Sequence, residues 1–440
     1  MPAPTLDREI ARLAGPALVA LLAEPVYLLA DTAVVGHLGT APLAGLAVAS
    51  SILLTATSLC IFLAYGTTAS VSRLLGAGRH ADAAEDAVQG VWLGLFVGVV
   101  LAIVLGLAGR PLIAALGAHG DVAAQALLYL RISLVGLPFL LVTLAGTGYL
   151  RGLQDTRTPL LVAVGTAVLN LVLELVLVYG LDQGIGASAV GTVLAQVVGA
   201  GLYLRAVGGA ARRAGAPLRP RLAQQRRLIR VGADLAIRTA SLRGALVLLT
   251  AVATRIGSDD VAAHQIAFEV WNLLAMGLDA LAIAGQALVG RLLGASDADG
   301  ARAASNRLLR LGIYACVGTG AVVAAVSPWL PHVFTDDPRV VHLVTFLLLW
   351  VAVLQPLAAV AFVLDGVLIG AGDQRFLAWA MAGAALVFAL AVAPILPLDA
   401  GIGWVWAAFG AFMAARAVVL LVRFRGDRWL VLGAVPVAAA

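Results

Sequence analysis

Twelve long apolar runs constrain the fold of this chain more than any other feature of its sequence. Each run holds roughly 20 mostly apolar residues, which is the length that a helix needs to cross the hydrocarbon core of a bilayer. No turn residues divide the runs at strand spacing, so strands are not expected. The sequence therefore predicts an all-α membrane protein with twelve transmembrane helices. The runs lie near residues 12–36, 47–71, 87–108, 125–149, 159–180, 187–207, 228–256, 264–289, 306–327, 342–366, 376–396 and 401–423.

The composition supports a location in a lipid bilayer. Of the 440 residues, 62% are hydrophobic and 12% are charged, whereas soluble domains are about half apolar and a quarter charged. All 29 basic residues are arginines gathered in particular connections, so the net charge of +5 indicates no nucleic-acid partner. Cys60 and Cys316 both lie in apolar runs and indicate neither a disulfide nor a metal site.

The connections between the runs alternate in their arginine content. One set, which includes both termini, reaches eight arginines between Arg205 and Arg230. The other set has only Arg110 and Arg339, beside seven aspartates. By the positive-inside rule, both termini are cytoplasmic, in a multi-pass protein of the inner (cytoplasmic) membrane. The run at 12–36 has no break that would mark a cleaved signal, so we expect it to be retained.

A repeat at an offset of 218 residues divides the runs into two sets of six. RLLGA occurs at 73–77 and again at 291–295, and the same register holds over 119 residues without a gap, which indicates a duplication. Since six is an even number, both copies insert in the same orientation. We expect two six-helix bundles related by a pseudo-two-fold axis along the membrane normal. The other aligned pairs are Gly39 with Gly257, Pro138 with Pro356, Gly148 with Gly366, Leu150 with Leu368, Gly152 with Gly370, Asp155 with Asp373 and Arg157 with Arg375.

The duplication predicts the domain organisation. Residues 1–208 form the first six-helix lobe and residues 228–430 the second. Residues 209–227 join them and contain two prolines and many arginines, so they are interpreted as a cytoplasmic basic linker. A solvated connector is favoured there over a lipid-binding segment.

Two acids interrupt the first apolar run. Glu24 and Asp31 are seven residues apart, which on a helix is almost two turns and places both on one face. Ionisable residues inside a membrane are costly, so they are functional candidates. Pro16 and Pro25 precede Asp31 and mark hinge positions, because proline breaks the backbone hydrogen-bond ladder of a helix.

The fifth run carries a second polar pair. Asn170 and Glu174 are four residues apart, hence on one helix face, and Glu174 lies at nearly the depth of Asp31. Two carboxyl groups at one depth in the same six-helix lobe indicate a site for a proton or another cation; a structural hydrogen-bonded network is the alternative. Thr192 and Gln196 in the sixth run are explained by helix–helix hydrogen bonding.

The second repeat lacks the first-run acid, because the residue that aligns with Asp31 is Leu249. A purely structural acid would more readily survive in both copies. The seventh run instead carries Arg238, which can pair along its own helix with Asp234 or across helices with Asp279.

Several charged or polar residues fit either an inter-helix bridge or a substrate cavity. Asp365, near the end of its run, is expected at the cytoplasmic interface. The candidates for the bridge or cavity are Glu24, Gln196, Arg238, Arg243 and Asp279.

Particular segments resemble the multidrug and toxic compound extrusion (MATE) family over essentially the whole chain. They are ADTAVVGHLG in the first run, GYLRGLQDTRTP after the fourth and NLVLE in the fifth. LDALAIAGQALVGRLLGA and DLAIRTASLRG are similar to the DinF-like branch of that family. The resemblance implies a V-shaped pair of lobes that alternates between inward-open and outward-open states and exports organic, often cationic, compounds in exchange for H⁺ or Na⁺. It also implies a monomer.

The resemblance also implies roles for particular residues. The family's cation-coupling acid matches Asp31, and its aromatic partner one turn earlier matches Tyr27. Its fifth-helix amide and acid match Asn170 and Glu174, and a sixth-helix threonine matches Thr192. The family commonly has Asp where this chain has Glu174, and the extra methylene affects Na⁺ geometry more than protonation.

The sequence is therefore interpreted as a secondary active efflux transporter of organic compounds, with H⁺ favoured over Na⁺ as the coupling ion. No Walker loop, nucleophile elbow or zinc spacing appears, so neither an enzyme nor a bound cofactor is expected. The alternative is a lipid-linked precursor flippase of the same superfamily, for which a cavity richer in arginine is expected.

Overall fold

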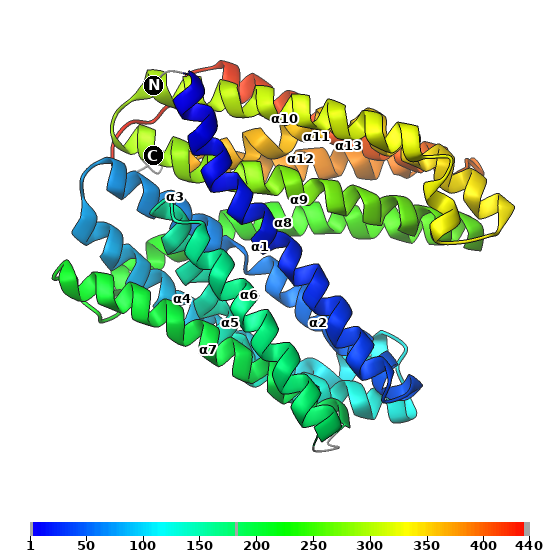
Figure 1. Cartoon of the computed structure of the whole chain (residues 1–440). Coiled ribbons are helices and arrows are strands. Elements are labelled where there is room, and N and C mark those ends of the chain that lie inside the picture. Colours follow the sequence, from blue (N-terminus) through cyan, green and yellow to red (C-terminus); the bar gives the residue numbers. More distant parts are fainter. Residues whose placement is uncertain (1–2, 181–183, 435–440) are drawn as a thin grey trace. The chain divides into compact units, whose positions relative to one another are not determined.

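The computed structural model describes residues 3–180 and 184–434, and every regular element in those ranges is a helix (Figure 1). Within these residues, twelve segments are long and apolar enough to cross a membrane. The predicted number of spans is therefore confirmed. Helices suit this environment because each satisfies its backbone hydrogen bonds internally, where lipid offers no donors or acceptors.

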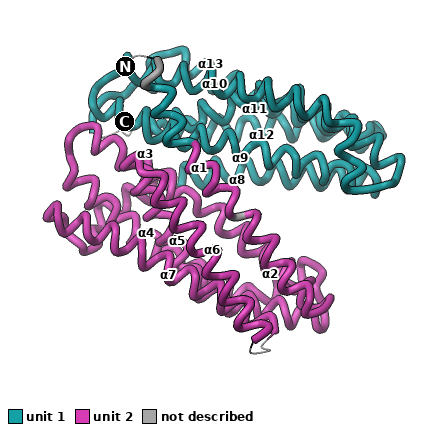
Figure 2. Tube along the Cα trace, in the orientation of Figure 1, with its two compact units in different colours: residues 1–14, 233–440 teal, residues 15–232 magenta. Residues whose placement is uncertain are grey.

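Residues 15–232 form one compact unit, here called the N-terminal unit (Figure 2). Helix α1 (Ala3–Gly36) enters it at residue 15, because its first residues group with the other unit. The following helices are α2 (Thr40–Leu59), α3 (Phe62–Gly76), α4 (His80–Ala115), α5 (Gly120–Gly152), α6 (Arg157–Glu174), a π-helix (Leu175–Gly180) and α7 (Gly184–Arg213).

Residues 1–14 and 233–440 form the other compact unit, here called the C-terminal unit. The predicted lobes met at a linker of residues 209–227, whereas α7 runs to Arg213 and the unit boundary falls after residue 232. The helices are α8 (Leu222–Ile256), α9 (Ser258–Gly294), α10 (Ala298–Val326), a 3₁₀ helix (Leu330–Val333), α11 (Pro338–Gly370), α12 (Gln374–Val392) and α13 (Ile402–Arg425).

One helix is central in each unit. In the N-terminal unit, α5 packs against α2, α3, α4 and α7. In the C-terminal unit, α11 packs against α9, α10 and α13. These two central helices contain the aligned prolines Pro138 and Pro356. The duplicated sequence therefore builds the same arrangement of packed helices twice.

Aligned glycines make the same close approach in both units. A Cβ on Gly148 would lie 2.5 Å from the carbonyl oxygen of Ala64, and a Cβ on Gly366 would lie 2.5 Å from that of Ala282. Ala64 and Ala282 are themselves 218 residues apart. Only glycine permits this contact, so the repeat is preserved in the backbone packing of α3 on α5 and of α9 on α11.

The turns after these helices also correspond. Gly78 follows α3 with φ of 74°, and Ser296, 218 residues later, follows α9 with φ of 59°. Gln154 after α5 and Gly372 after α11 form a second such pair, with φ of 61° and 81°. A left-handed residue ends a helix by letting the next amide groups reach back to its last carbonyl oxygens. The equivalent helices therefore end in the same way in both units.

One span differs between the repeats. The predicted run at 47–71 is broken between α2 and α3 at Cys60 and Ile61, whereas its counterpart α9 is a single helix. The residue of α9 that aligns with Ile61 is Asp279.

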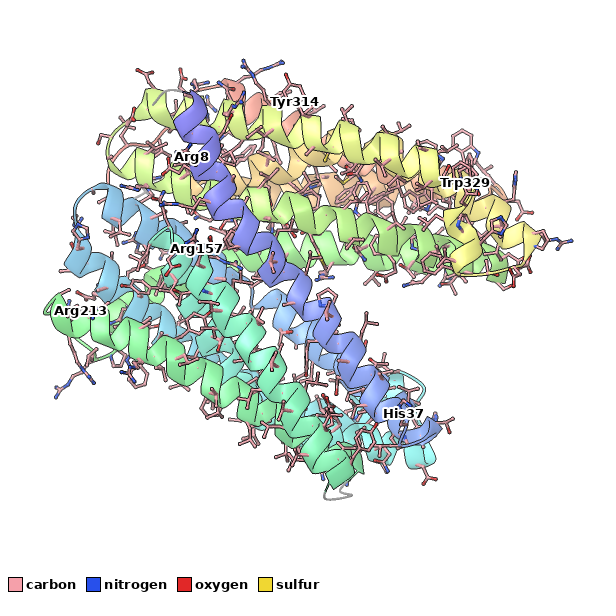
Figure 3. All side chains as sticks on the ribbon, viewed as in Figure 1. Arg8, His37, Arg157, Arg213, Tyr314 and Trp329 are labelled. Carbon is pink, nitrogen blue, oxygen red and sulfur yellow. The ribbon has the colours of Figure 1, made fainter. Side chains whose placement is uncertain are left out.

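Side chains at the helix ends distinguish the two ends of each unit (Figure 3). In the N-terminal unit, Arg157 and Arg213 lie at one end and His37 lies at the other. In the C-terminal unit, Arg8 lies at one end and Trp329 at the other. The arginines lie at the ends that the sequence assigns to the arginine-rich connections.

Candidate functional site

Asp31 and Ser188 form the centre of a buried polar site in the N-terminal unit. Asp31 lies near the end of α1 and is 2% exposed, and Ser188 in α7 is fully buried. The Ser188 hydroxyl donates a hydrogen bond to Asp31 Oδ1 over 2.8 Å. A carboxyl group enclosed in this way is held on a defined side of its helix.

Glu174 is the second acid of the site. It is the last residue of α6, directly before the π-helix, and it is fully buried. Its side chain lies beside Asp31 and Ser188. Neither of its carboxyl oxygens is aligned with a hydrogen-bond donor among the described residues. A short π-helix often marks a functional position, because it changes the direction of the side chains around it.

Tyr27, Asn170 and Thr192 form a hydrogen-bonded group at the same site. The Thr192 hydroxyl lies 3.1 Å from the Tyr27 hydroxyl, and Asn170 Nδ2 donates to Thr192 Oγ1 over 3.0 Å. Tyr129 in α5 is buried and interacts with both Thr192 and Asp31. The structure thus brings together the five residues that the MATE resemblance matched.

Sequence reasoning missed Ser188 and Tyr129. Ser188 lies four residues before Thr192, so the two share one face of α7. That spacing was the available signal. Tyr129 has no such partner in its own helix, and only the packing of α5 reveals it.

The site has the chemistry of a proton or small-cation site. Two carboxyl groups that are buried side by side cannot both be ionised without a large electrostatic cost, which a shared proton or a bound cation would remove. The side-chain oxygens of this group include those of Asp31, Glu174, Asn170, Ser188 and Thr192. Asn170 Oδ1 has no hydrogen-bond partner among the described residues. Carboxylate, amide and hydroxyl oxygens are also suitable ligands for a hard cation such as Na⁺.

The remaining candidates of the N-terminal unit are Gln196, Pro16, Pro25 and Glu24. Gln196 is half-buried in α7 and packs on the backbone of α5, because a Cβ on Gly136 would lie 1.9 Å from Gln196 Oε1. Pro16 and Pro25 both lie within α1, which is helical throughout its length. The side chain of Glu24 lies outside the described residues.

Arg238 forms an inter-helix bridge with Asp365, a partner that was not expected from the sequence. Its Nε donates to Asp365 Oδ1 over 2.9 Å, and a second guanidinium nitrogen pairs with Oδ2. Asp365 is 5% exposed, so its carboxylate is enclosed by protein. A buried arginine favours such two-point pairing, because its planar fork matches a carboxylate. The bridge joins α8 to α11.

A second arginine lies near this bridge. Arg416 in α13 is 3% exposed, and its guanidinium lies over the rings of Phe362 and Phe412, 5.3 and 5.5 Å from their centroids. Arg238 and the half-buried Asp279 are close enough to interact with it electrostatically. Arg243, by contrast, is exposed.

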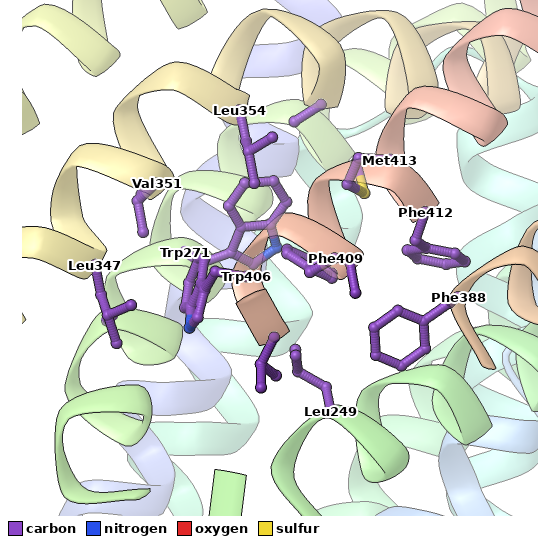
Figure 4. Packing of buried hydrophobic residues seen from close by; sticks show 14 of the residues in the cluster. Leu249, Trp271, Leu347, Val351, Leu354, Phe388, Trp406, Phe409, Phe412 and Met413 are labelled. Atoms are coloured by element: carbon purple, nitrogen blue, oxygen red, sulfur yellow. The ribbon is translucent and has the colours of Figure 1, made fainter. Parts of the chain in front are cut away.

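The positions that align with the polar site are apolar in the C-terminal unit. Asp31 aligns with Leu249, Asn170 with Phe388 and Ser188 with Trp406, each at the offset of 218. These three residues belong to one buried cluster, which also contains Trp271, Phe409 and Phe412 (Figure 4). The ring centroids of Trp406 and Phe409 are 5.7 Å apart, with the rings edge to face. The same scaffold therefore holds a polar site in one unit and an aromatic core in the other.

The chain matches the model of the MatE family over residues 16–176 and 237–395. The two matched segments cover most of the two units, and each contains one copy of the repeat.

Curated relatives match nearly the whole chain. Protein DETOXIFICATION 44, chloroplastic, of Arabidopsis thaliana is 31% identical, over 94% of this chain and 81% of the relative. Protein DETOXIFICATION 43 of the same plant is 29% identical, over 95% and 90%. DNA damage-inducible protein F of Escherichia coli (strain K12) is 28% identical, over 95% and 92%.

Solved structures share the fold. A MATE protein described in the bent conformation superposes with a TM-score of 0.87 at 23% identity, over 96% of this chain and 95% of that one. An outward-facing multidrug resistance MATE family transporter of the MOP superfamily gives 0.86 at 23% identity, with the same coverage.

Proposed function

Because the chain belongs to the MatE family of multidrug efflux transporters, we propose that it exports organic, often cationic and amphipathic, compounds in exchange for H⁺ by alternating access. It is a multi-pass membrane protein with twelve spans among its described residues and a transporter, not an enzyme. The proposal includes an inner-membrane location, cytoplasmic termini and a monomeric state.

The observation that carries this proposal is the pair of buried acids. Asp31 and Glu174 lie side by side in a membrane-spanning unit, where an ionised acid is costly. The other unit retains its packing with Leu249 and Val392 at the aligned positions. The acids are therefore not needed for this fold, and a change of protonation gives them a reason to be there.

In the proposed cycle, the polar site binds protons from outside and releases them inside. Protonation removes the repulsion between Asp31 and Glu174, whereas deprotonation favours a conformation in which at least one acid reaches water or a cation. A ligand shifts such an equilibrium only through its different affinity for the two states. Proton binding and substrate binding therefore oppose each other through one conformational equilibrium, with Pro16 and Pro25 as hinge positions in α1.

H⁺ is favoured over Na⁺ because two adjacent acids need only one shared proton. A sodium site requires several oxygens at fixed distances around the ion. The donor set fits such a site, and Asp31, Glu174 and Asn170 would hold the ion. Sodium is thus the alternative that the experiment distinguishes.

Efflux of a fluorescent cationic dye from reconstituted vesicles tests the proposal. A pH gradient is imposed in sodium-free buffer, and in a second series a sodium gradient is imposed at equal pH. Wild type is compared with Asp31→Asn, which removes the titratable group while keeping the shape. We expect dye movement under the pH gradient alone, and its loss in the variant.

The other outcomes identify the alternatives. Movement only with the sodium gradient assigns the same residues to Na⁺. Wild-type transport by Asp31→Asn contradicts the coupling role of that acid. If neither gradient moves the dye, the alternative function, a flippase of lipid-linked precursors, is favoured. Translocation of such a lipid in the same vesicles then tests it.

A further inference from the structure

The boundaries between the two compact units fall at equivalent points in the first helix of each repeat. One boundary lies between residues 14 and 15 in α1, and the other lies between residues 232 and 233 in α8. The boundaries are 218 residues apart, which is the offset of the repeat. The start of α1 therefore belongs to the C-terminal unit, and the start of α8 belongs to the N-terminal unit.

An ion pair holds the start of α1 on α10. Arg307 Nε donates to Asp7 Oδ1 over 2.6 Å, and a second guanidinium nitrogen donates to Asp7 Oδ2 over 2.5 Å. The two side chains are 31% and 37% exposed. The pairing is two-pronged, so it fixes the orientation of the helix end as well as its distance.

A network of amide hydrogen bonds holds the start of α8 on α4. Gln225 Nε2 donates to the backbone oxygen of Gln89 over 2.9 Å and to its Oε1 over 3.0 Å. Gln89 is fully buried, and its side chain also accepts from the backbone N–H of Arg221 over 2.8 Å. Arg221 in turn pairs with Glu85 over 2.6 Å. The segment before α8 is thus bound through its backbone and its side chains.

The two attachments use the same positions of the repeat. Asp7 aligns with Gln225, and Arg307 aligns with Gln89, both at the offset of 218. One position on the first helix of each repeat therefore meets one position on the third span of the other repeat. The same two positions are in contact in both cases, but the pair is ionic at Asp7 and Arg307 and consists of two amides at Gln225 and Gln89.

We propose that these contacts are two reciprocal clasps. They hold the start of α1 to the C-terminal unit, and the start of α8 to the N-terminal unit, throughout the transport cycle. Motion between the units is then taken up within α1 and α8, next to residues 14–15 and 232–233. Pro16 and Gly232 lie at these points, and both residue types lower the cost of bending a helix. The inference rests on the proposed transport function.

Reversible cross-linking tests whether the clasps persist. Asp7→Cys/Arg307→Cys and, separately, Gln89→Cys/Gln225→Cys are made in a background with Cys60→Ala and Cys316→Ala. A short bifunctional methanethiosulfonate joins each pair, and dithiothreitol releases it. We expect dye efflux by the cross-linked proteins to stay within about twofold of the same proteins after release.

Arrest of transport by the cross-link, with recovery after dithiothreitol, would overturn the proposal and make the clasps gates that open. The cross-linking yield is also measured under pH gradients of both directions. This yield reports whether the two cysteines of a clasp are close together, and it does not depend on dye transport. Persistent clasps give equal yields, whereas opening clasps give a lower yield in one direction. A protein that moves no dye even before cross-linking speaks against the proposed function, and the yields still decide the clasps.

Charge exchange separates pairing from simple structural damage. Asp7→Arg places two cations together and lowers the temperature of unfolding, and Asp7→Arg/Arg307→Asp restores most of it. Asp427→Arg is the matched control, because Asp427 pairs with Arg302 over 2.6 Å in the same unit but is 89% exposed. No rescue by the exchanged pair would mean that these side chains do not hold the helix end.

Discussion

The two units place different chemistry on one scaffold. Around the N-terminal acids, the aligned residues of the C-terminal unit are aliphatic or aromatic, or lack a side chain. The glycine contacts and helix ends, by contrast, correspond closely. The aligned pairs are Asp31 with Leu249, Asn170 with Phe388, Glu174 with Val392, Ser188 with Trp406 and Thr192 with Gly410. Helix packing and the polar site are therefore separable properties of the same repeat.

The C-terminal unit has its own buried charges, but at other positions. Arg238, Asp365 and Arg416 align with Ala20, Thr147 and Val198 of the N-terminal unit. In the first unit the acids face each other, whereas in the second an acid faces an arginine. An opposed pair holds its charge permanently, while two adjacent acids respond to protons. Under the proposed function, exchange would belong to the N-terminal unit and structural bridging to the C-terminal unit.

Asp31→Leu is expected to have the largest effect, because it gives the N-terminal unit the residue of its counterpart. We expect pH-driven dye efflux to be lost while the protein still folds, since Leu249 shows that the scaffold accepts leucine there. The temperature of unfolding in detergent should fall by no more than about 3 °C. Efflux at the wild-type rate would show that pH-driven transport does not need the acid at position 31.

Removing one partner of the C-terminal bridge is expected to act on stability. Asp365→Asn leaves the buried Arg238 without its carboxylate, at a cost of about 3–5 kcal/mol in the free energy of unfolding. Arg238→Met/Asp365→Leu should recover most of the loss, because it removes both charges. Chemical unfolding measures both variants. If the double variant were as unstable as the single one, the bridge would have a role beyond pairing.

Trp406 and Ser188 occupy equivalent positions, so substituting each by alanine compares their effects on stability and on coupling. Trp406→Ala removes a fully buried ring and should cost about 3–5 kcal/mol of stability, with coupling intact in the folded fraction. Ser188→Ala should cost about 1 kcal/mol or less and change the pH dependence of efflux, because Asp31 loses its donor. Stability and the pH profile are measured for both variants, and the reverse pattern would contradict the assignment.

Tyr27→Phe is expected to have the smallest effect. It removes the hydrogen bond between the Tyr27 and Thr192 hydroxyls, which contributes about 0.5–1.5 kcal/mol. We therefore expect the efflux rate to fall about 2- to 10-fold. Tyr314→Phe serves as the control, because that ring is 68% exposed in the C-terminal unit. Equal losses in the two variants would show that the polar group contributes nothing specific.

Much of the fold could be predicted from the sequence because the bilayer imposes a length on each span. Twelve runs and one offset were enough to predict the twelve spans and the duplication. The break at Cys60 and Ile61 could not be predicted, since no proline or glycine lies at that point and the aligned helix is continuous. Packing with neighbouring helices determines it.

The candidate site was partly predictable. Asp31 and Glu174 stand out because acids are rare in apolar runs, whereas Ser188 and Tyr129 are ordinary in such runs. The pairing of Arg238 with Asp365 was missed because Asp365 lies near the end of its run, where sequence favours an interfacial position. Depth along a helix can be counted from sequence, but the choice among several acids at similar depth depends on how the helices rotate.

The contact of Gly148 with α3, and of Gly366 with α9, has a consequence for the history of this chain. An identical approach in both halves is most simply inherited from one ancestral gene of half the length. Features that differ between the halves, including the acids, then arose or were lost after that gene was doubled. A doubled gene leaves one copy free to change its chemistry while the other preserves the first task. The glycine contacts therefore predate the doubling, whereas the difference between the two halves at the acid positions followed it.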